Sequence, residues 1–321
     1  MKSPRPRPAW VGVLFWLGLN RQRSQGELRG SLWRCSSAHR VPELPEVETV
    51  RRGLERQLQG FHINRIEVLR ARAVAWPPDP ALFCQALSDC TVGTWSRRGK
   101  YLIAALEQHG ESAGHWGVHL RMTGQFLWHE NPGEPCRHTR VRVWNEAGQE
   151  LRFVDTRSFG QMWWVPPDQA PEAVITGLQK LGPEPFSAAF SPEHLAERLV
   201  GSSRPIKSAL LDQGLVAGVG NIYADESLFL SGIAPSTASG RIGLARLETL
   251  HAALVEVLHT SIGAGGTTFS DFRDLSGTNG NYGNAAWVYR RGGEPCRQCG
   301  TPIRREKLGG RSSHWCPVCQ R

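Results

Sequence analysis

The chain has 321 residues, 40% of them hydrophobic and 12 of them tryptophan, which fits a globular protein of roughly two domains and excludes a disordered one. Its net charge of +9 suggests an anionic partner, but residues 1–40 carry +7 and residues 289–321 carry +6, which leaves −4 on residues 41–288. The basic C-terminal segment is therefore the better candidate for contact with a nucleic acid, and no apolar run reaches the roughly 18 residues of a membrane span.

The N-terminal segment, residues 2–19, combines a basic start with a short apolar run. A secretory signal peptide has this pattern, but no small-residue cleavage site follows it here. Secretion is therefore an alternative that the sequence does not favour.

A helix is predicted from Pro45, because proline suits the first turn and the acidic residues after it suit the positive end of the helix dipole. Apolar residues recur at helical spacing from Val47 to Leu58, and Gly60 can end the helix. From Ile63 to about residue 165, short runs punctuated by Gly and Pro indicate strands: "RIEVLRA", "YLIAALE", "HWGVHLRM", "RVRVWN", "LRFVDT" and "QMWWVP". This part is expected to form an antiparallel β-sandwich or barrel.

A proline-rich bridge, "PPDQAPEAVITGLQKLGPEP", contains the expected domain boundary. Helices are predicted after it in "SPEHLAERLV", "RPIKSALLDQ", "NIYADESLFLSG" and "GLARLETLHAALVEVLHTSI". A loop rich in Gly and Asn follows the last of these helices.

Four cysteines near the C-terminus have the spacing of a metal site. Cys296-x-x-Cys299 and Cys316-x-x-Cys319 are separated by sixteen residues, and two such turns supply the four thiolates that tetrahedral Zn²⁺ prefers. A closed shell leaves no position for water, so one structural Zn²⁺ is expected, with a redox dithiol as the alternative. The other four cysteines lack a disulfide spacing and are read as reduced thiols of a cytosolic protein.

The segment "RPIKSALLDQGLVAGVGNIYADESLF" predicts a glycine-rich turn between two helices. Glycines allow backbone amides to approach an anion, and Asn221 stands where the second helix begins, which is a favourable place for phosphate. Lys207 adds positive charge nearby. The alternative is an ordinary interhelical turn without a ligand.

Several motifs occur in a fixed order along residues 42–321: "PELPEVE", "RRGKYL", "HLRMTG", "DTRSFG", "LGPEP", "GVGNIYADESLF", "GGTT", "VYRR" and the four-cysteine finger. In this order they resemble formamidopyrimidine-DNA glycosylase, a bifunctional base-excision-repair enzyme that excises oxidised purines. The resemblance implies an α+β fold with DNA lying across the cleft between two parts. Its expected domains are a catalytic antiparallel β-sandwich at 42–166, a helix–two-turn–helix DNA-binding domain at 184–288 and a zinc-ribbon finger at 289–321.

The resemblance also implies the chemistry. Pro42, as an N-terminal secondary amine, attacks the sugar C1′, the base leaves, and a Schiff base leads to β- and δ-elimination. Glu43 matches the general acid/base that assists opening of the sugar ring. Lys100 matches the proton donor for β-elimination, and Arg311 matches the donor for the second elimination.

The family extrudes the damaged nucleotide from the stack, and Met122, Arg157 and Phe159 match the side chains that fill the space left behind. His138, Asn221 and Lys207 match phosphate contacts or their neighbours. The implied partner is double-stranded DNA that contains oxidised bases or abasic sites, bound by a monomer in a bacterial cytoplasm at the nucleoid.

Two departures from the family pattern occur. Arg140 stands where many relatives have a second histidine, and it can still bind phosphate. The loop from Thr267 to Tyr282 matches the loop that covers the flipped lesion, but from Thr278 onward the sequence reads "TNGNYGNAAW" rather than a Pro-Gly-aromatic pattern.

The position of Pro42 inside the chain raises two rival interpretations. As an internal residue Pro42 has no nucleophilic amine, and the chain would then be a non-catalytic DNA-binding protein. We instead expect residues 1–41 to be a non-native leader from a misplaced start, since Val41 stands where relatives have the initiator Met and a GUG codon is read as Met only at a start. A cleaved targeting leader is a further alternative.

The closest alternative activity belongs to the same family. An endonuclease VIII-like enzyme for oxidised pyrimidines shares the fold and the proline nucleophile. Its relatives usually open with Pro-Glu-Gly-Pro-Glu, whereas Leu44 occupies the glycine position here. Leu44, Met122 and the long loop therefore favour the purine enzyme.

Overall fold

The structure is a computed structural model that describes residues 42–267 and 282–321. All of the described residues belong to one compact unit. The expected leader, residues 1–41, and nearly all of the expected lesion loop lie outside the described residues. Within the described ranges, no helix is long and apolar enough to cross a membrane.

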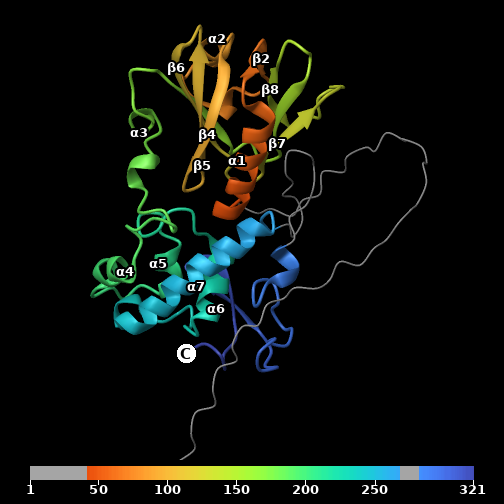
Figure 1. The fold of residues 1–321 in the computed structure, drawn as a ribbon. Helices are drawn as coiled ribbons and strands as arrows, with labels where there is room; N and C mark the ends of the chain where they lie inside the picture. Colours follow the sequence, from red (N-terminus) through yellow and green to blue (C-terminus); the bar gives the residue numbers. More distant parts are fainter. Residues whose placement is uncertain (1–41, 268–281) are drawn as a thin grey trace, which may run out of the picture. The chain divides into compact units, whose positions relative to one another are not determined.

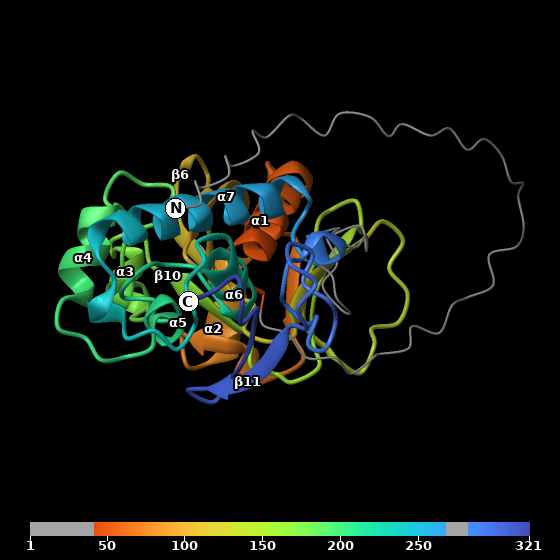
Figure 2. The same cartoon turned by 90° about the horizontal axis from the view of Figure 1, so that it is seen from below.

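Helix α1, Leu44–Leu58, begins beside the predicted position, and a capping box closes its N-terminus. In this motif the carboxylate of Glu46 accepts a hydrogen bond from the Glu43 N–H at 2.9 Å. The predicted apolar face is buried, and Gly60 follows the helix with a φ of 74°. The helix contacts β4 and β5 as well as α7 (Figures 1 and 2).

Two sheets form the N-terminal part (Figure 1). The strand orders are β1-β4-β5-β6-β10-β3 and β2-β8-β9-β7, and every pair is antiparallel except β10 with β3. The strands are β1 Phe61–His62, β2 Arg65–Val68, β3 Val74–Trp76, β4 Thr91–Arg98, β5 Tyr101–Gln108, β6 Glu111–His119, β7 Gly124–His129, β8 Thr139–Trp144, β9 Glu150–Asp155 and β10 Gln161–Val165.

A single apolar core takes in buried side chains from both sheets, from α1 and from α2, Pro80–Leu87. The expected antiparallel β-sandwich is confirmed, apart from the one parallel pair. All six predicted strand segments are strands, whereas β1, β3, β4 and β7 were not expected. In β4 the register shifts between Val92 and Trp95, and this irregularity interrupts the alternation that reveals a strand in sequence.

Helices dominate the second part, and the four that the sequence predicts are present. Buried residues from α4 to α7 and from the glycine-rich turn form a second apolar core. The helices of this part and of the bridge before it are α3 Pro171–Val174, α4 Pro192–Leu199, α5 Ile206–Leu210, α6 Asn221–Leu230 and α7 Leu244–Gly263.

The C-terminal finger contains a hairpin of β11, Arg304–Leu308, and β12, Arg311–Trp315. Gly309 and Gly310 form its turn with φ values of 55° and 77°, which glycine adopts without strain. Strand β12 contacts α6. The finger is therefore docked on the helix that follows the glycine-rich turn.

Candidate active site and zinc finger

The glycine-rich turn before α6 brings together three regions that are far apart in the sequence. The Leu44 N–H donates to the Gly218 carbonyl at 3.0 Å, and the Lys100 ammonium donates to the Val219 carbonyl at 3.0 Å. The turn therefore joins the start of α1, the β4–β5 turn and the start of α6.

The anion at the N-terminus of α6 is the carboxylate of Glu43. It accepts hydrogen bonds from the backbone N–H groups of Ile222 at 3.0 Å and Tyr223 at 3.4 Å, in the place where a helix N-terminus attracts negative charge. A Cβ on Gly220 would lie 2.2 Å from the Glu43 Cδ. Glycine at this position is therefore what allows the carboxylate to reach the helix.

Glu43 and Lys100 have altered proton affinities. Burial raises the pKa of Glu43 to about 7, although the charge of Lys100 and the two backbone hydrogen bonds oppose the rise. Burial lowers the pKa of the Lys100 ammonium, and the charge of Arg311 adds to this lowering against the carboxylates of Glu43 and Glu46. A carboxyl group that titrates near neutral pH can both donate and accept a proton under cellular conditions.

Pro42 is buried beside Glu43, and Arg311 is an exposed residue at the start of β12. The charge of Arg311 acts on both Lys100 and Lys207. The four residues that the resemblance makes catalytic thus lie around the turn or act on it electrostatically. Their catalytic roles stay predictions.

Glu46 belongs to a buried cluster beside Glu43. The Tyr223 hydroxyl donates to its carboxylate at 2.6 Å, and the Thr267 N–H donates to the same oxygen at 2.7 Å. The hydroxyls of Ser261 and Thr267 lie 2.6 and 2.7 Å from the Tyr223 oxygen. Burial raises the pKa of Glu46, which these hydrogen bonds partly offset.

Lys207, which the resemblance places among phosphate contacts or their neighbours, is buried. Its side chain is 1% exposed, its ammonium lies 2.6 Å from a carboxylate oxygen of Asp225, and it donates to the Ser312 carbonyl at 2.6 Å. Asp225 also accepts from the backbone N–H of His314 at 2.9 Å. The cluster links α5, α6 and the finger hairpin, and contact of Lys207 with DNA stays a prediction.

Asn221 opens α6 and is partly exposed. Its Oδ1 atom is buried and has no hydrogen-bond partner among the described residues. The backbone donors of the next two residues, which the sequence suggests for phosphate, are used by Glu43. A phosphate contact of Asn221 itself stays a prediction.

The other expected DNA contacts gather on the sheet domain. Met122 is half-buried in the β6–β7 loop, and Phe159, in the β9–β10 loop, is 36% exposed. The Arg157 guanidinium lies 4.7 Å from the centre of the Phe159 ring. His138 is flanked by Arg140, whose guanidinium nitrogen lies 3.3 Å from the His138 ring, so the residue that departs from the family pattern adds a cation at the expected place.

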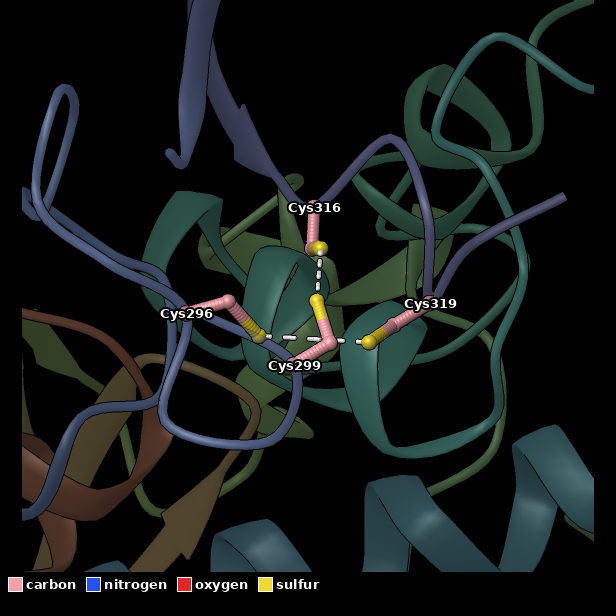
Figure 3. Close-up of side chains that lie close together, drawn as sticks. All are labelled: Cys296, Cys299, Cys316 and Cys319. Atoms are coloured by element: carbon pink, nitrogen blue, oxygen red, sulfur yellow. Dashed lines mark hydrogen bonds between the residues drawn. The ribbon is translucent and has the colours of Figure 1, made fainter. Parts of the chain in front are cut away.

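The four cysteines predicted to bind zinc converge in the finger (Figure 3). Their Sγ atoms all lie within 4.8 Å of one another, with 3.9 Å between Cys296 and Cys319 and 3.5 Å between Cys299 and Cys316. A tetrahedral zinc site with Zn–S bonds of about 2.3 Å places sulfur atoms about 3.8 Å apart. The site therefore fits one structural Zn²⁺, as predicted.

Several buried residues of the site were not singled out from sequence. Glu226 accepts hydrogen bonds from three consecutive backbone N–H groups, those of Trp287, Val288 and Tyr289. Asp225 and Tyr223 hold the two clusters described above. All three residues lie inside "GVGNIYADESLF", but helical spacing alone cannot show which of their neighbours they meet.

Three domain families match the chain. They are the formamidopyrimidine-DNA glycosylase N-terminal domain at residues 41–162, the formamidopyrimidine-DNA glycosylase H2TH domain at residues 181–273 and the zinc finger found in FPG and IleRS at residues 293–321. A curated relative, the formamidopyrimidine-DNA glycosylase of Parasynechococcus marenigrum, is 68% identical over 280 residues, which cover 87% of this chain and all of the relative.

Solved structures with the same fold come from Lactococcus lactis FPG. A mutant in complex with DNA that contains Fapy-dG has a TM-score of 0.80 at 34% identity, with 87% of this chain and 100% of that chain covered. The wild-type protein in complex with DNA that contains an oxidised pyrimidine has a TM-score of 0.79, with the same identity and the same coverage.

Proposed function

Because the chain belongs to the formamidopyrimidine-DNA glycosylase family and is a DNA glycosylase of base-excision repair, we propose that it removes oxidised purines, namely 8-oxoguanine and formamidopyrimidines, from double-stranded DNA. We further propose that it cleaves the resulting abasic site by β,δ-elimination through a Schiff base. The observation that carries this proposal is the Glu43 carboxyl group, held between Pro42 and the N-terminus of α6 with a pKa of about 7. The enzyme is proposed to act as a monomer on the nucleoid in the cytoplasm.

The first step in this mechanism is attack by the Pro42 nitrogen on the sugar C1′, which breaks the bond between C1′ and the base. A neutral secondary amine is a good nucleophile, and a terminal amine has a pKa near about 8, so a useful fraction is neutral in the cell. Glu43 assists by giving a proton to the sugar ring oxygen as the ring opens. Its raised pKa supports this role, because a substantial fraction of Glu43 carries the proton at neutral pH.

The iminium that links Pro42 to the opened sugar then acidifies the adjacent C–H bond, and two eliminations release the flanking phosphates. We assign proton donation in the first to Lys100 and in the second to Arg311. The lowered pKa of Lys100 favours loss of its proton. Zn²⁺ bound by the four cysteines would hold the finger that carries Arg311, with no direct part in the reaction.

This chemistry requires Pro42 to be a free N-terminus, so we propose that the active protein begins at Pro42 and lacks residues 1–41. The test compares the full chain with a chain whose initiator Met replaces Val41 and is removed in the cell. Intact mass establishes where each purified chain begins. Borohydride is then added during reaction with abasic-site DNA, and peptide mapping locates the crosslink.

The expected crosslink is on Pro42 of the shorter chain alone. If a chain that still begins at Met1 forms the same crosslink, the Pro42 mechanism is wrong. If neither chain crosslinks or cuts, the non-catalytic DNA-binding interpretation replaces it.

A second substrate class is favoured by one observation, the complex of Lactococcus lactis FPG with an oxidised pyrimidine. Single-turnover excision from duplexes that contain 8-oxoguanine or thymine glycol separates the two classes. We expect faster excision of 8-oxoguanine. Preference for thymine glycol would assign the chain to the endonuclease VIII-like alternative.

A further inference from the structure

Two loops of the sheet domain cross between the sheets side by side. Residues 120–123 connect β6 to β7, and residues 156–160 connect β9 to β10. Gly124 pairs with Asp155 in one sheet, and His119 pairs with Gln161 in the other. Because both ends of the two loops are paired, the loops run next to each other at one edge of the sandwich.

The buried carboxylate of Asp155 joins these loops. One of its oxygens accepts hydrogen bonds from the Thr123 hydroxyl in the first loop and from the Arg157 N–H, at 3.1 Å, in the second. The other oxygen accepts from the Gly160 N–H at 2.7 Å, and the Thr123 hydroxyl oxygen accepts in turn from the Arg157 N–H at 3.1 Å. We name Asp155, Thr123 and the N–H groups of Arg157 and Gly160 the loop clasp.

The hydrogen bonds of the loop clasp support a strained stretch of backbone. Arg121 and Ser158, one in each loop, have φ values of 55° and 54°, a left-handed conformation that costs energy for residues other than glycine. A Cβ on Gly124 or on Gly160 would lie 2.7 or 2.5 Å from the Cζ of Phe153. The ring of Phe153 is therefore packed closely by both glycines, and the loop clasp lies directly above a tightly packed core.

The residues beside the loop clasp are the ones expected to enter the DNA. Met122 immediately precedes Thr123, while Arg157 and Phe159 flank Ser158. The Phe159 ring is also approached by Arg72, whose guanidinium lies 5.4 Å from the ring centre. The loop clasp is thus next in sequence to Met122 and Arg157, and the Arg157 guanidinium lies 4.7 Å from the centre of the Phe159 ring.

We propose that Asp155 is a positioning residue that holds Met122, Arg157 and Phe159 as one preformed wedge for the space left by an extruded nucleotide. This inference rests on the proposed function. A wedge that is already ordered loses less conformational freedom when it enters the helix, so the loop clasp accelerates extrusion of the damaged base. The chemistry at Pro42 and Glu43 does not depend on it.

The main test uses a matched pair of variants at Thr123. Thr123→Val keeps the shape and removes the hydroxyl, whereas Thr123→Ser keeps the hydroxyl. We expect Thr123→Val to slow single-turnover excision of 8-oxoguanine from a duplex by roughly tenfold, the effect of about one lost hydrogen bond, and Thr123→Ser to match the wild type. Borohydride trapping on single-stranded abasic DNA, which has no base to extrude and no space to fill, is expected to be unchanged in both variants.

Two further measurements separate the possible failures. Fluorescence of 2-aminopurine next to the lesion follows extrusion, and it is expected to rise more slowly with Thr123→Val and with Asp155→Asn. Hydrogen exchange of residues 120–124 and 156–160 without DNA is expected to be faster in Thr123→Val than in Thr123→Ser, which tests the loop clasp without any activity.

Equal excision by the two Thr123 variants would overturn the inference, as would an equal loss on duplex and single-stranded substrates. If the wild type fails to excise oxidised bases while the exchange rates of the two variants differ, the proposed function is wrong and the loop clasp stands as a structural feature only.

Discussion

Two of the buried acids at helix α6, Glu43 at its N-terminus and Asp225 on the helix itself, have different surroundings. Glu43 is bound to the N-terminus of the helix by backbone N–H groups, and no cation of the described residues lies within ion-pair distance of its carboxylate. Asp225, further along the same helix, lies 2.6 Å from the ammonium of Lys207 and 3.2 Å from the ring of His314. Glu43 is hydrogen-bonded by backbone N–H groups and feels the charge of Lys100 from beyond ion-pair distance, whereas Asp225 forms a direct ion pair.

This difference fits the catalytic role that we propose for Glu43 and a structural role for Asp225. Without an ion pair, burial dominates at Glu43 and raises its pKa to about 7, which suits a group that must exchange protons. The ion pair of Asp225 instead fixes the finger hairpin on α6 and α5. We infer that a buried acid serves proton transfer at one end of α6 and domain docking on its side.

The largest expected effect comes from breaking the ion pair. Lys207→Met keeps the aliphatic stem but leaves the Asp225 carboxylate buried without its cation, so the free energy of unfolding should fall by about 3–5 kcal/mol. The finger should also lose zinc to a chelator sooner. Urea unfolding and chelator-induced zinc release measure both effects.

Lys307→Met is the matched control, because Lys307 is exposed on β11 and its replacement should change stability by less than about 0.5 kcal/mol. If Lys207→Met resembles this control in stability but weakens DNA binding, then Lys207 contacts phosphate and the docking role is wrong.

The second prediction concerns the proton affinity of Glu43. Its pKa is about 7 in the folded protein, against an ordinary value of 4.5. The folded state therefore binds more protons than the unfolded state between these pH values, and stability falls as the pH rises. Glu43→Gln removes this titration. Relative to the wild type, the variant should therefore gain about 3 kcal/mol of stability between pH 4 and pH 8, while excision is lost.

Glu48→Gln provides a control of opposite sign. Partial burial raises the pKa of Glu48, but hydrogen bonds from Arg51 and Arg52 outweigh this and lower it below 4.5. The ionised carboxylate therefore stabilises the wild type above pH 4.5, and this stabilisation is lost as the pH falls. Because glutamine cannot ionise, Glu48→Gln should become less stable relative to the wild type as the pH rises toward and above 4.5. Unfolding curves at several pH values test both signs, and parallel pH profiles for the two variants would contradict the assignment.

Sequence alone predicted the parts of these centres that depend on local pattern. The spacing of apolar residues and the capping residues predict α1 and the helices on both sides of the glycine-rich turn. The spacing of the cysteines predicts the four zinc ligands. The resemblance added Pro42, Glu43 and Lys100. In isolation, Glu43 and Lys100 suggest only surface charges.

The long-range partners were not predictable in the same way. The sequence suggests phosphate for the N-terminus of α6, but the structure has Glu43 there, 179 positions away from Ile222. Lys207 has Asp225 and Ser312 around its ammonium, partners that no local pattern indicates. The type of a charged residue shows what it can bind, but only the fold shows which partner lies next to it.

The third prediction tests how closely Glu43 approaches α6. In Gly220→Ala the new Cβ would lie 2.2 Å from the Glu43 Cδ, so the carboxylate must move away from its two backbone donors. We expect a loss of about 1–3 kcal/mol in stability and a much larger loss of excision than of DNA binding.

Gly263→Ala is the control for this change, because nothing lies within 4 Å of its added Cβ and alanine favours the end of α7. Gly220→Ala with normal excision would mean that the contact between Glu43 and the helix is not needed for catalysis.

The smallest expected effect lies in the hydroxyl cluster behind Glu43. Tyr223→Phe removes the donor to Glu46 and leaves the hydroxyls of Ser261 and Thr267 without their shared partner, which should cost about 1 kcal/mol. Because the lost hydrogen bond lowers the pKa of Glu46 in the wild type, its removal raises that pKa, and the variant should become less stable relative to the wild type as the pH rises.

A double-mutant cycle with Ser261→Ala identifies the source of the effect, since residues that share one hydrogen bond couple by about 0.5–3 kcal/mol. Additive losses would show that Tyr223 contributes by packing alone. Coupling that is present at pH 8 and weak at pH 5 would instead show that the cluster responds to the charge on Glu46, which places a second titrating acid beside Glu43 and extends the reactive centre of α6 inward from its N-terminus.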